Sequence, residues 1–444
     1  MLYRLLLNKG ENYLMLGLLI LGIFVVLILL NVPISFSMGL AVSVGLLITG
    51  VSGIVVPQQL VSGIQSWTLL AVPFFILAAQ IMNKGGLTEG LFDFAGEIVG
   101  SIKGGLGHAN VLASMIFAGI SGAAVADASG LGLVEYRAMV SSGYEKRFAV
   151  GITAASCMLG PIIPPSIMLI IYGHQAELSI ASLWFAGIIP GIMTGLMLMG
   201  YIYYSVSRGT WGAPPTHPFS IRRAGKSFLR NLPILPLPFL LLWAIVSGVA
   251  TPTETGIIAC MYAFIVGLLY KRKEFLKNVP KVFLESAKST ATIMFIIGAA
   301  TAFVWLITRE QTAIMIANGL LSLTNNKYVI LLIINFFLLI VGSLIEQIPA
   351  MLIIVPLLAP LAPQLGVNPI QFGIMTVFNL MIGMITPPMG MALYIMGTIT
   401  DVAMKDIIVA SLRFFFVLLA ALLLISYIPI LSTFVPNLFG FTMF

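Results

Sequence analysis

The chain has 444 residues, of which 59% are apolar and only 8% are charged, and its formal net charge is +7. This composition excludes a water-soluble globular domain, because apolar runs of about 18 residues or more recur along the sequence. The positive charge gathers in short segments between apolar runs, so it reports membrane topology and does not indicate nucleic-acid binding. The sequence therefore predicts an all-α polytopic protein surrounded by membrane lipid.

Ten apolar segments are predicted to cross the bilayer. They are residues 13–30, 36–56, 66–82, 149–173, 183–207, 231–249, 254–270, 289–307, 370–397 and 411–436. The first has no small-residue cleavage site and is too long for a signal-peptide core. Basic clusters at 208–230 and 271–281 are separated by two spans, so they share the cytoplasmic face. Both chain ends are then expected outside, although Arg4 and Lys9 at the N-terminus depart from this charge rule.

Apolar segments are interrupted in the same way in both halves of the chain. A polar patch at 119–127 precedes a Pro-Pro break at 160–166, and a patch at 342–349 precedes a Pro-Pro break at 383–390. Paired interruptions of this kind are typical of the binding site of a secondary transporter. The sequence therefore predicts two repeats, each with a hairpin followed by a broken helix.

The hairpins are predicted at 108–142 and 328–362, each too long for one crossing and polar at mid-length. Two half-helices that meet at a re-entrant tip fit this pattern. Amphipathic arm helices at 86–103 and 309–325 precede them. Five crossings separate the starts of the repeats, so the repeats are predicted to be inverted.

The predicted organisation has five parts. These are N-terminal scaffold spans (1–65), a first inverted repeat (66–182), central scaffold spans with basic cytoplasmic loops (183–288), a second inverted repeat (289–400) and a C-terminal scaffold span (401–444).

The two Pro-Pro breaks predict a cation and anion symport site. Proline removes a backbone donor, so carbonyls within 160–166 and 383–390 become free to coordinate a hard cation. The ends of half-helices can face an anion. The alternative, that the prolines only kink two helices, does not account for the two hairpins that accompany them.

Two acidic residues lie in the hairpins at nearly symmetric places. A carboxylate at the bilayer centre costs roughly 2.5–3.5 kcal/mol and usually marks an ion or substrate pathway. Asp127 and Glu346 are therefore candidates for cation sites. Asp127 could instead cap the second half-helix through its backbone amides. Asn379 could supply an amide oxygen to the second site or join two helices.

The motifs at 72–78, 117–122, 126–132, 160–166, 379–383 and 386–390 closely resemble the large membrane subunit, DctM or SiaM type, of tripartite ATP-independent periplasmic (TRAP) transporters. The resemblance covers nearly the whole chain. It implies a multi-pass protein of the bacterial inner membrane that couples sodium entry to uptake of a small organic anion by an elevator mechanism. The anion class includes C4-dicarboxylates, sialic acid and sugar acids. Implied partners are a separate four-helix membrane subunit and a periplasmic binding protein, with sodium as coupling ion and no cofactor.

The resemblance also implies the residues of the site. Sodium ligands are expected among Ser121, Gly122, Asp127, Gly160, Pro161, Pro164, Ser343, Glu346, Gly383 and Thr386. Substrate contacts are expected from Ser121, Ala123, Ser166 and Thr386. The hydroxyl groups among them could equally satisfy their own helix backbone. Two positions depart from the usual pattern of the family, since residue 123 is Ala where many members have Ser and residue 346 is Glu where Asp is usual.

Two other functions compete with this hypothesis. A stand-alone sodium and carboxylate symporter would share the paired hairpins but need no binding protein. An intramembrane enzyme or scaffold is the third possibility. The sequence contains no phosphate-binding loop followed by Lys, no zinc-protease motif and no convincing pair of nucleophile and base, which argues against an enzyme and against ATP coupling.

Overall fold

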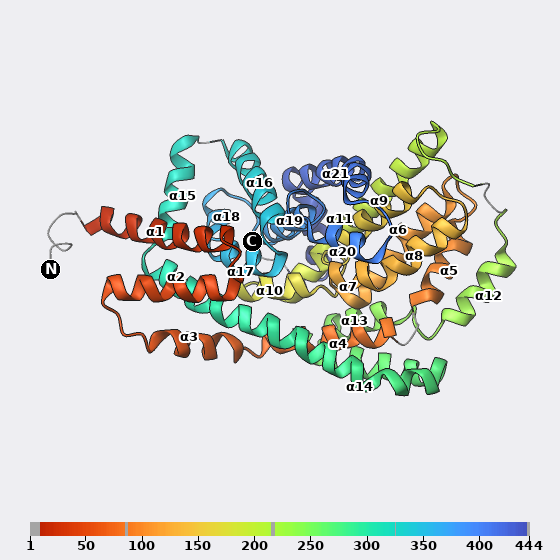
Figure 1. Cartoon of the computed structure of the whole chain (residues 1–444), viewed down its shortest axis with the longest axis horizontal. Helices are drawn as coiled ribbons and strands as arrows, with labels where there is room; N and C mark the ends of the chain where they lie inside the picture. The colour runs from red at the N-terminus through yellow and green to blue at the C-terminus, as the bar shows by residue number, and fades with distance from the viewer. Residues whose placement is uncertain (1–8, 85–87, 215–217, 325, 442–444) are drawn as a thin grey trace.

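The computed structural model describes residues 9–84, 88–214, 218–324 and 326–441 (Figure 1). Over these residues the chain consists of α-helices, two single 3-10 turns and short connections, without a strand, which confirms the predicted all-α class. Arg4 and the outer ends of the two predicted arms, at 86 and 325, lie outside the described residues.

Seven elements from the N-terminal and central parts of the chain pack together as one layer. They are α1 (Lys9–Leu29), α2 (Ile34–Thr49), α3 (Val55–Ile64), η2 (Thr68–Leu70), α4 (Ala71–Lys84), α13 (Leu237–Val246) and α14 (Pro252–Arg309). Helix α14 packs against α2, α3, α4 and α13, and α1 packs against α2. In Figure 1 this layer forms the lower left of the molecule, with α14 along its edge.

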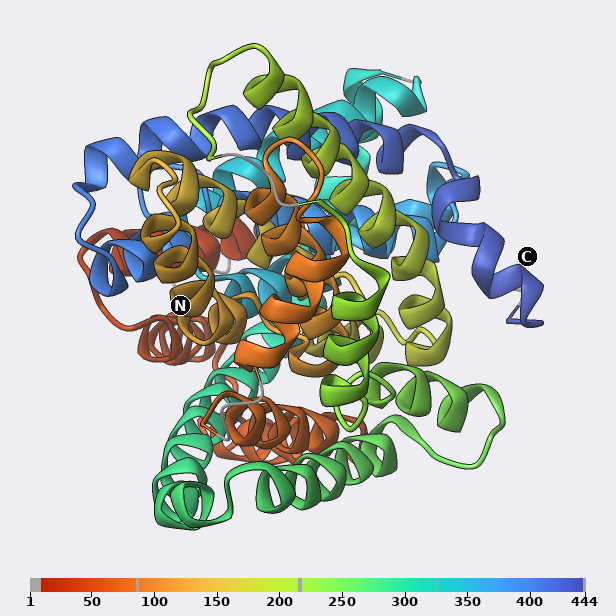
Figure 2. The same ribbon diagram turned by 90° about the vertical axis from the view of Figure 1, so that its right-hand side faces the viewer.

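Helix α14 corrects the prediction of two spans joined by a basic loop at 271–288. The segment is helical throughout. The rings of Phe264 and Phe275 nevertheless lie only 5.3 Å apart, whereas eleven residues of straight helix would separate them by about 16 Å. The helix therefore bends sharply into two apolar arms, Pro252–Tyr270 and Phe275–Arg309 (Figure 2). Lys and Arg favour helix, so a basic segment need not become a loop.

The two amphipathic arms are helices, but shorter ones than expected. They are α5 (Thr88–Val99) and α15 (Thr312–Leu323). After α5 the chain turns at Gly104, whose φ of +87° favours glycine. Arg309 is the last residue of α14 and not the first of an arm. Helix α5 packs against α6, α8 and α12, and α15 against α1, α14 and α17.

The remaining helices form the larger body that holds the predicted hairpins and broken helices. They are α6 (Gly105–Ser121), α7 (Ala124–Ser129), α8 (Leu131–Ser141), α9 (Lys146–Ser156), η3 (Cys157–Leu159), α10 (Ile167–Gln175), α11 (Ile180–Ser207), α12 (Ile221–Asn231), α16 (Lys327–Leu344), α17 (Gln347–Leu358), α18 (Leu361–Gln364), α19 (Pro369–Gly383), α20 (Met391–Ile399), α21 (Met404–Tyr427) and α22 (Ile430–Leu438).

The predicted spans match these helices unevenly. Five described helices are long and apolar enough to cross a membrane, or six if the pair α3 and α4, bent by 59°, is one span. Ten crossings therefore remain a prediction. The span predicted at 411–436 is wrong in its bounds, because α21 starts at Met404 and ends at Tyr427, ahead of Pro429. A proline there cannot donate the hydrogen bond that would continue the helix.

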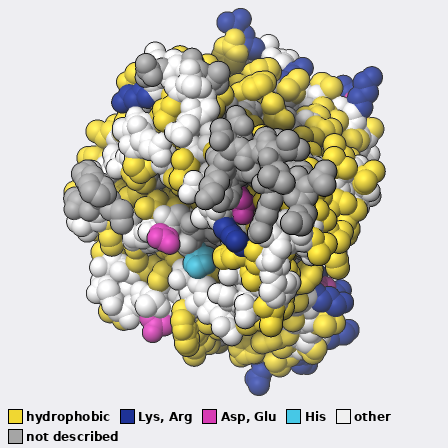
Figure 3. Space-filling model, turned by 90° about the vertical axis from the view of Figure 1, so that its left-hand side faces the viewer, with side chains coloured by type: hydrophobic (Ala, Val, Ile, Leu, Met, Phe, Trp, Pro, Cys, Tyr) yellow, Lys and Arg dark blue, Asp and Glu magenta, His cyan; other side chains and the backbone are white. Residues whose placement is uncertain are grey.

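In the view from the left of Figure 1, hydrophobic side chains cover much of the right-hand part of the face, while basic, acidic and His side chains are visible near its middle; most other Lys and Arg lie near the rim (Figure 3). This pattern fits the low share of charged residues in the chain, 8%.

Helices α16 and α19 cross at two glycines. A Cβ placed on Gly342 would lie 3.0 Å from the Leu380 carbonyl oxygen and 3.3 Å from the Gly383 Cα. A Cβ on Gly383 would collide with the backbone of Gly342. Backbone atoms cannot swing aside as a flexible side chain can, so the crossing has no room for a side chain at Gly383 and very little at Gly342.

We predict that Gly383→Ala lowers the stability of the chain by about 1–3 kcal/mol, the usual range for overpacking. The thermal midpoint of the detergent-purified protein measures this. Gly200→Ala is the matched control, because Gly200 is helical and has open space at its Cβ position; the control should be neutral or slightly stabilising. Equal midpoints for the two variants would contradict the prediction.

Candidate functional site

At the first break, the tip of the predicted hairpin touches the broken helix through backbone atoms. Helix α6 ends at Ser121 with Gly122 as its C-cap, and the amide of Ile167, the first residue of α10, donates to the Gly122 carbonyl at 3.2 Å. Gly122 has a φ of +61°, and a Cβ there would lie 2.5 Å from the Pro165 carbonyl oxygen. Glycine is therefore needed at this position for its conformation and for its size.

Asp127 lies at this contact and is 2% exposed. Its Oδ1 accepts a short hydrogen bond from the Ser121 hydroxyl, and its Oδ2 has no partner among the described residues. Gly160 leaves the space that Oδ2 occupies, because a Cβ there would collide with it. Asp127 sits inside α7, whose N-cap is Ala123, and bonds a hydroxyl and not backbone amides. The expectation that it caps the half-helix is therefore wrong.

The structure brings Ser121, Gly122, Ala123, Asp127 and Gly160 together. The same Cβ position on Gly160 is 3.4 Å from the Ala123 carbonyl carbon. One carboxylate oxygen without a partner thus faces the irregular backbone between η3 and α10.

Ser166 has a local role. Its hydroxyl accepts from the Leu169 amide at 3.1 Å as the N-cap of α10 and donates to the Pro161 carbonyl. Its own carbonyl accepts from Trp184 Nε1 at 3.2 Å. This hydroxyl and the Pro161 carbonyl therefore satisfy each other.

The second break repeats the backbone contact. Helix α16 ends at Leu344, α17 starts at Gln347, and the Met389 amide donates to the Ser343 carbonyl at 3.0 Å. At both breaks the carbonyls of the Pro-Pro pair stay open. No hydrogen bond within the described residues ends on the carbonyl oxygens of Pro164, Pro165, Pro387 or Pro388.

The hydroxyls of the second break are bonded to their own helices, which was the alternative stated for them. Ser343 donates to the Ile340 carbonyl at 2.8 Å and Thr386 to the Ile382 carbonyl at 2.9 Å. A hydroxyl that donates in this way keeps its oxygen lone pairs, so both oxygens can still accept from or coordinate a ligand.

Glu346 stands at the N-terminus of α17 and lines a cavity of about 190 Å³. Gly342, Met389 and Tyr394 line the same cavity. No hydrogen bond or ion pair within the described residues engages the Glu346 carboxylate. The one acidic residue predicted at this break therefore has an unpaired carboxylate next to an open cavity.

Of the two roles considered for Asn379, the structure shows the interhelical hydrogen bond, and the supply of an amide oxygen to the second site stays a prediction. Its amide nitrogen donates to the carbonyl and side-chain oxygens of Asn335 at 3.0 and 2.8 Å, which joins α19 to α16. Its own Oδ1 is buried and has no partner among the described residues.

The two breaks are linked because the short helix after each break packs against a helix of the other predicted hairpin. Helix α20, which follows the second break, packs against α7 of the first hairpin, and α10, which follows the first break, packs against α17 of the second. These four short helices lie near the centre of the molecule (Figure 1).

A buried polar network in the first half was missed from the sequence. Glu135 on α8 is 1% exposed and accepts from Asn110 Nδ2 at 2.7 Å. Asn110 also bonds Thr153 and Ser156 of α9 at 2.9 and 2.7 Å, and Ser114 bonds Ser156 at 3.1 Å. A second carboxylate inside the predicted hairpin was the available signal, but its partners Asn110 and Ser114 lie 25 and 21 residues away in sequence.

The polar groups at the two breaks are almost all oxygen atoms. Each has one acidic side chain, hydroxyls and open carbonyls, which are ligands for a hard cation. The described residues contain no group of three or more His, Cys, Asp or Glu placed to hold a metal ion.

Comparison with known proteins identifies the family. The model of the tripartite ATP-independent periplasmic transporter, DctM component, matches residues 21–431. The chain belongs to this family. It is 38% identical over 414 residues to the sialic acid TRAP transporter large permease protein SiaM of Vibrio cholerae, covering 93% of this chain and 96% of that one. It is 39% identical over 376 residues to the C4-dicarboxylate TRAP transporter large permease protein DctM of Pseudomonas aeruginosa, covering 85% and 88%.

The fold also matches a solved membrane transporter. The Alcanivorax borkumensis YdaH transporter superposes with a TM-score of 0.59 at 15% identity, covering 83% of this chain and 86% of that one. The predicted identity as a large TRAP permease is confirmed, and the chain is a multi-pass inner-membrane transport protein and not an enzyme.

We predict that Glu135→Ala destabilises this permease by about 1–3 kcal/mol, because Asn110 and Ser114 then lose a buried acceptor. The thermal midpoint in detergent measures the loss. Glu145→Ala is the control, since Glu145 is exposed at the start of α9 and makes no side-chain cap. A midpoint equal to that of the control would show that the network contributes nothing.

Proposed function

We propose that the chain imports a small organic anion together with sodium, after a periplasmic binding protein has delivered the anion. The observation that carries this proposal is the pair of backbone contacts at the breaks, Ile167 to Gly122 and Met389 to Ser343. Each contact lies beside open prolyl carbonyls and one acidic side chain. Irregular backbone at membrane depth is tolerated where it lines a cavity or is buried in protein, and transporters use it to bind ions.

The first proposed sodium site combines Ser121, Gly122, Asp127, Gly160 and Pro164. Its support is the unpartnered Asp127 Oδ2 beside Gly160. Pro161, also expected as a ligand, has its carbonyl engaged by Ser166. It would join the site only if that hydrogen bond opened.

The second proposed sodium site combines Ser343, Glu346, Gly383 and Thr386. Two observations support this second site. Glu346 lines a cavity, and the hydroxyl oxygens of Ser343 and Thr386, which donate to their own chain, can still accept from or coordinate a ligand. A longer acid than the usual Asp reaches further, so Glu346 is the residue we expect to distinguish this second site from that of other family members.

The organic anion is proposed to bind between the two sodium sites, with Ser121, Ala123 and Thr386 as contacts. Ser166, also expected as a contact, would join them only if its hydrogen bonds with Pro161 and Leu169 opened. The packing of α20 on α7 and of α10 on α17 supports a site shared by both halves. Permeases named for sialic acid and for C4-dicarboxylates are both similar to this chain, so an organic acid is the expected class. The proposed partners of the permease are the small membrane subunit and the binding protein of the tripartite system.

An elevator motion requires a moving block and a fixed scaffold, and the packing suggests a division that differs from the one expected from sequence. Helices α11 and α21 were assigned to the scaffold. They pack against α6, α9, α10 and α19, which carry the breaks or lead into them. We therefore propose that both move with the breaks, and that the scaffold consists of α1 to α4, α13 and α14.

Uptake into proteoliposomes tests the function. With the chain, its small subunit and its binding protein present, labelled sialic acid or succinate should accumulate only under an inward sodium gradient. Equal uptake in potassium buffer with the proton gradient collapsed would refute sodium coupling. Omission of the binding protein distinguishes the alternative, because a stand-alone carboxylate symporter would retain full uptake without it.

We expect Asp127→Ala and Glu346→Ala to reduce sodium-driven uptake at least tenfold while membrane insertion is unchanged. Each substitution removes the one carboxylate of its proposed site. Glu145→Ala and Glu177→Ala are controls, because neither residue lies at a break. The sodium concentration for half-maximal uptake should rise in both site variants, and an unchanged value in both would show that the two carboxylates are structural.

A further inference from the structure

Helix α12 (Ile221–Asn231) has two chemically opposite faces. Ile221, Phe228 and Leu229 are exposed by 81%, 45% and 68%. The same short helix carries four basic residues, Arg222, Arg223, Lys226 and Arg230. Exposed apolar side chains beside basic ones are typical of a helix that lies in the headgroup layer of a membrane.

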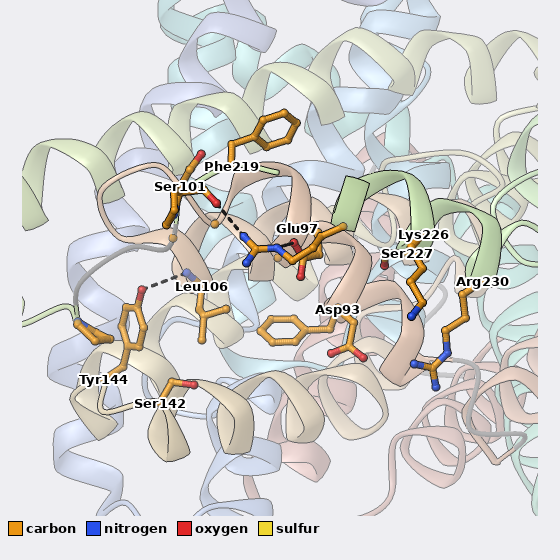
Figure 4. A pocket seen from close by; sticks show the side chains of 17 residues that line it. Asp93, Glu97, Ser101, Leu106, Ser142, Tyr144, Phe219, Lys226, Ser227 and Arg230 are labelled. Carbon is orange, nitrogen blue, oxygen red and sulfur yellow. Dashed lines mark hydrogen bonds and ion pairs between the residues drawn. The ribbon is translucent and has the colours of Figure 1, made fainter. Parts of the chain in front are cut away.

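A cavity of about 530 Å³ is lined by residues of α5, the start of α6 and α12. Figure 4 shows Lys226 and Arg230 extending from α12 in the same direction, with Asp93 and Glu97 of α5 nearby. The volume lies within the range of pockets that hold small ligands. Apolar side chains complete the lining, including Phe92, Leu106 and Phe219.

The charges of the cavity leave an excess of basic groups. Arg223 is paired with Glu97 at 3.1 Å and also donates to the Pro218 carbonyl at 2.7 Å. Lys226 and Arg230 line the same cavity, and no ion pair among the described residues joins either of them. Asp93, which also lines it, has an interaction of its own. The two cationic side chains are thus available to an anion.

We propose that this cavity binds the headgroup phosphate of an anionic phospholipid of the cytoplasmic leaflet, with Lys226 and Arg230 as its contacts. The segment belongs to the basic cluster predicted for the cytoplasmic face, where basic pockets bind anionic headgroups. A free phosphate would need only the charges. The exposed apolar side chains on the same helix favour a lipid, because its acyl chains can cover them. The site is separate from both breaks and does not depend on the proposed transport function.

The test uses the full chain, purified and delipidated in a neutral detergent. Binding of phosphatidylglycerol, phosphatidylcholine and inorganic phosphate is measured by native mass spectrometry and by the shift of the thermal midpoint. Lys226→Gln with Arg230→Gln should weaken phosphatidylglycerol binding about fivefold for each charge removed, and so more than tenfold together. Phosphatidylcholine binding should not change.

Two further variants serve as controls. Arg272→Gln with Lys273→Gln removes the same charges from exposed positions of α14 outside the cavity, and should change phosphatidylglycerol binding less than twofold. Lys226→Arg with Arg230→Lys keeps the charge and should retain binding, which separates loss of charge from loss of structure. The proposal is overturned if phosphatidylglycerol binds no tighter than phosphatidylcholine, if both Gln pairs behave alike, or if inorganic phosphate competes as well as the lipid.

Discussion

Backbone polar groups that leave a helix inside a membrane must find partners within the protein, and this constraint shapes the centre of the molecule. Where water is absent, an unpaired amide or carbonyl costs several kcal/mol. The chain meets the constraint by setting each hairpin tip against a Pro-Pro break. The Ile167 amide bonds Gly122 and the Met389 amide bonds Ser343. Only part of the freed backbone is paired in this way, and the Pro164 carbonyl, which is left over, belongs to the first proposed sodium site.

Small residues make this arrangement possible. Gly122 lies against Pro165, Gly160 leaves room for the Asp127 carboxylate, and Gly342 meets Gly383 backbone to backbone. A side chain at Gly122 or Gly383 would collide with backbone atoms of the facing segment, and one at Gly160 would collide with the Asp127 carboxylate. The polar network around Glu135 also holds neighbouring helices together, because its hydrogen bonds join α6 to α8 and to α9. The first hairpin and the first broken helix are in this way held as a unit.

Much of the site could be predicted from sequence because its signals are local. A Pro-Pro pair interrupts a helix wherever it occurs, and a carboxylate in an apolar run is conspicuous. Local signals identified Asp127 but not its hydrogen-bond partner, which is the Ser121 hydroxyl and not a backbone amide. They also missed Glu135, whose partners come from helices distant in sequence.

The sequence by itself determined the membrane class, the positions of both breaks, the family and the candidate residues. Each of these follows from short stretches of consecutive residues, such as apolar runs, prolines and motifs. Only the tertiary structure decided which groups are free to act. It committed the Ser166 hydroxyl to Pro161 and left Asp127 Oδ2 open. It also bent α14 where a loop was expected and packed α11 and α21 against the breaks. These outcomes depend on contacts between segments far apart in the chain, and no pattern within one segment encodes such contacts.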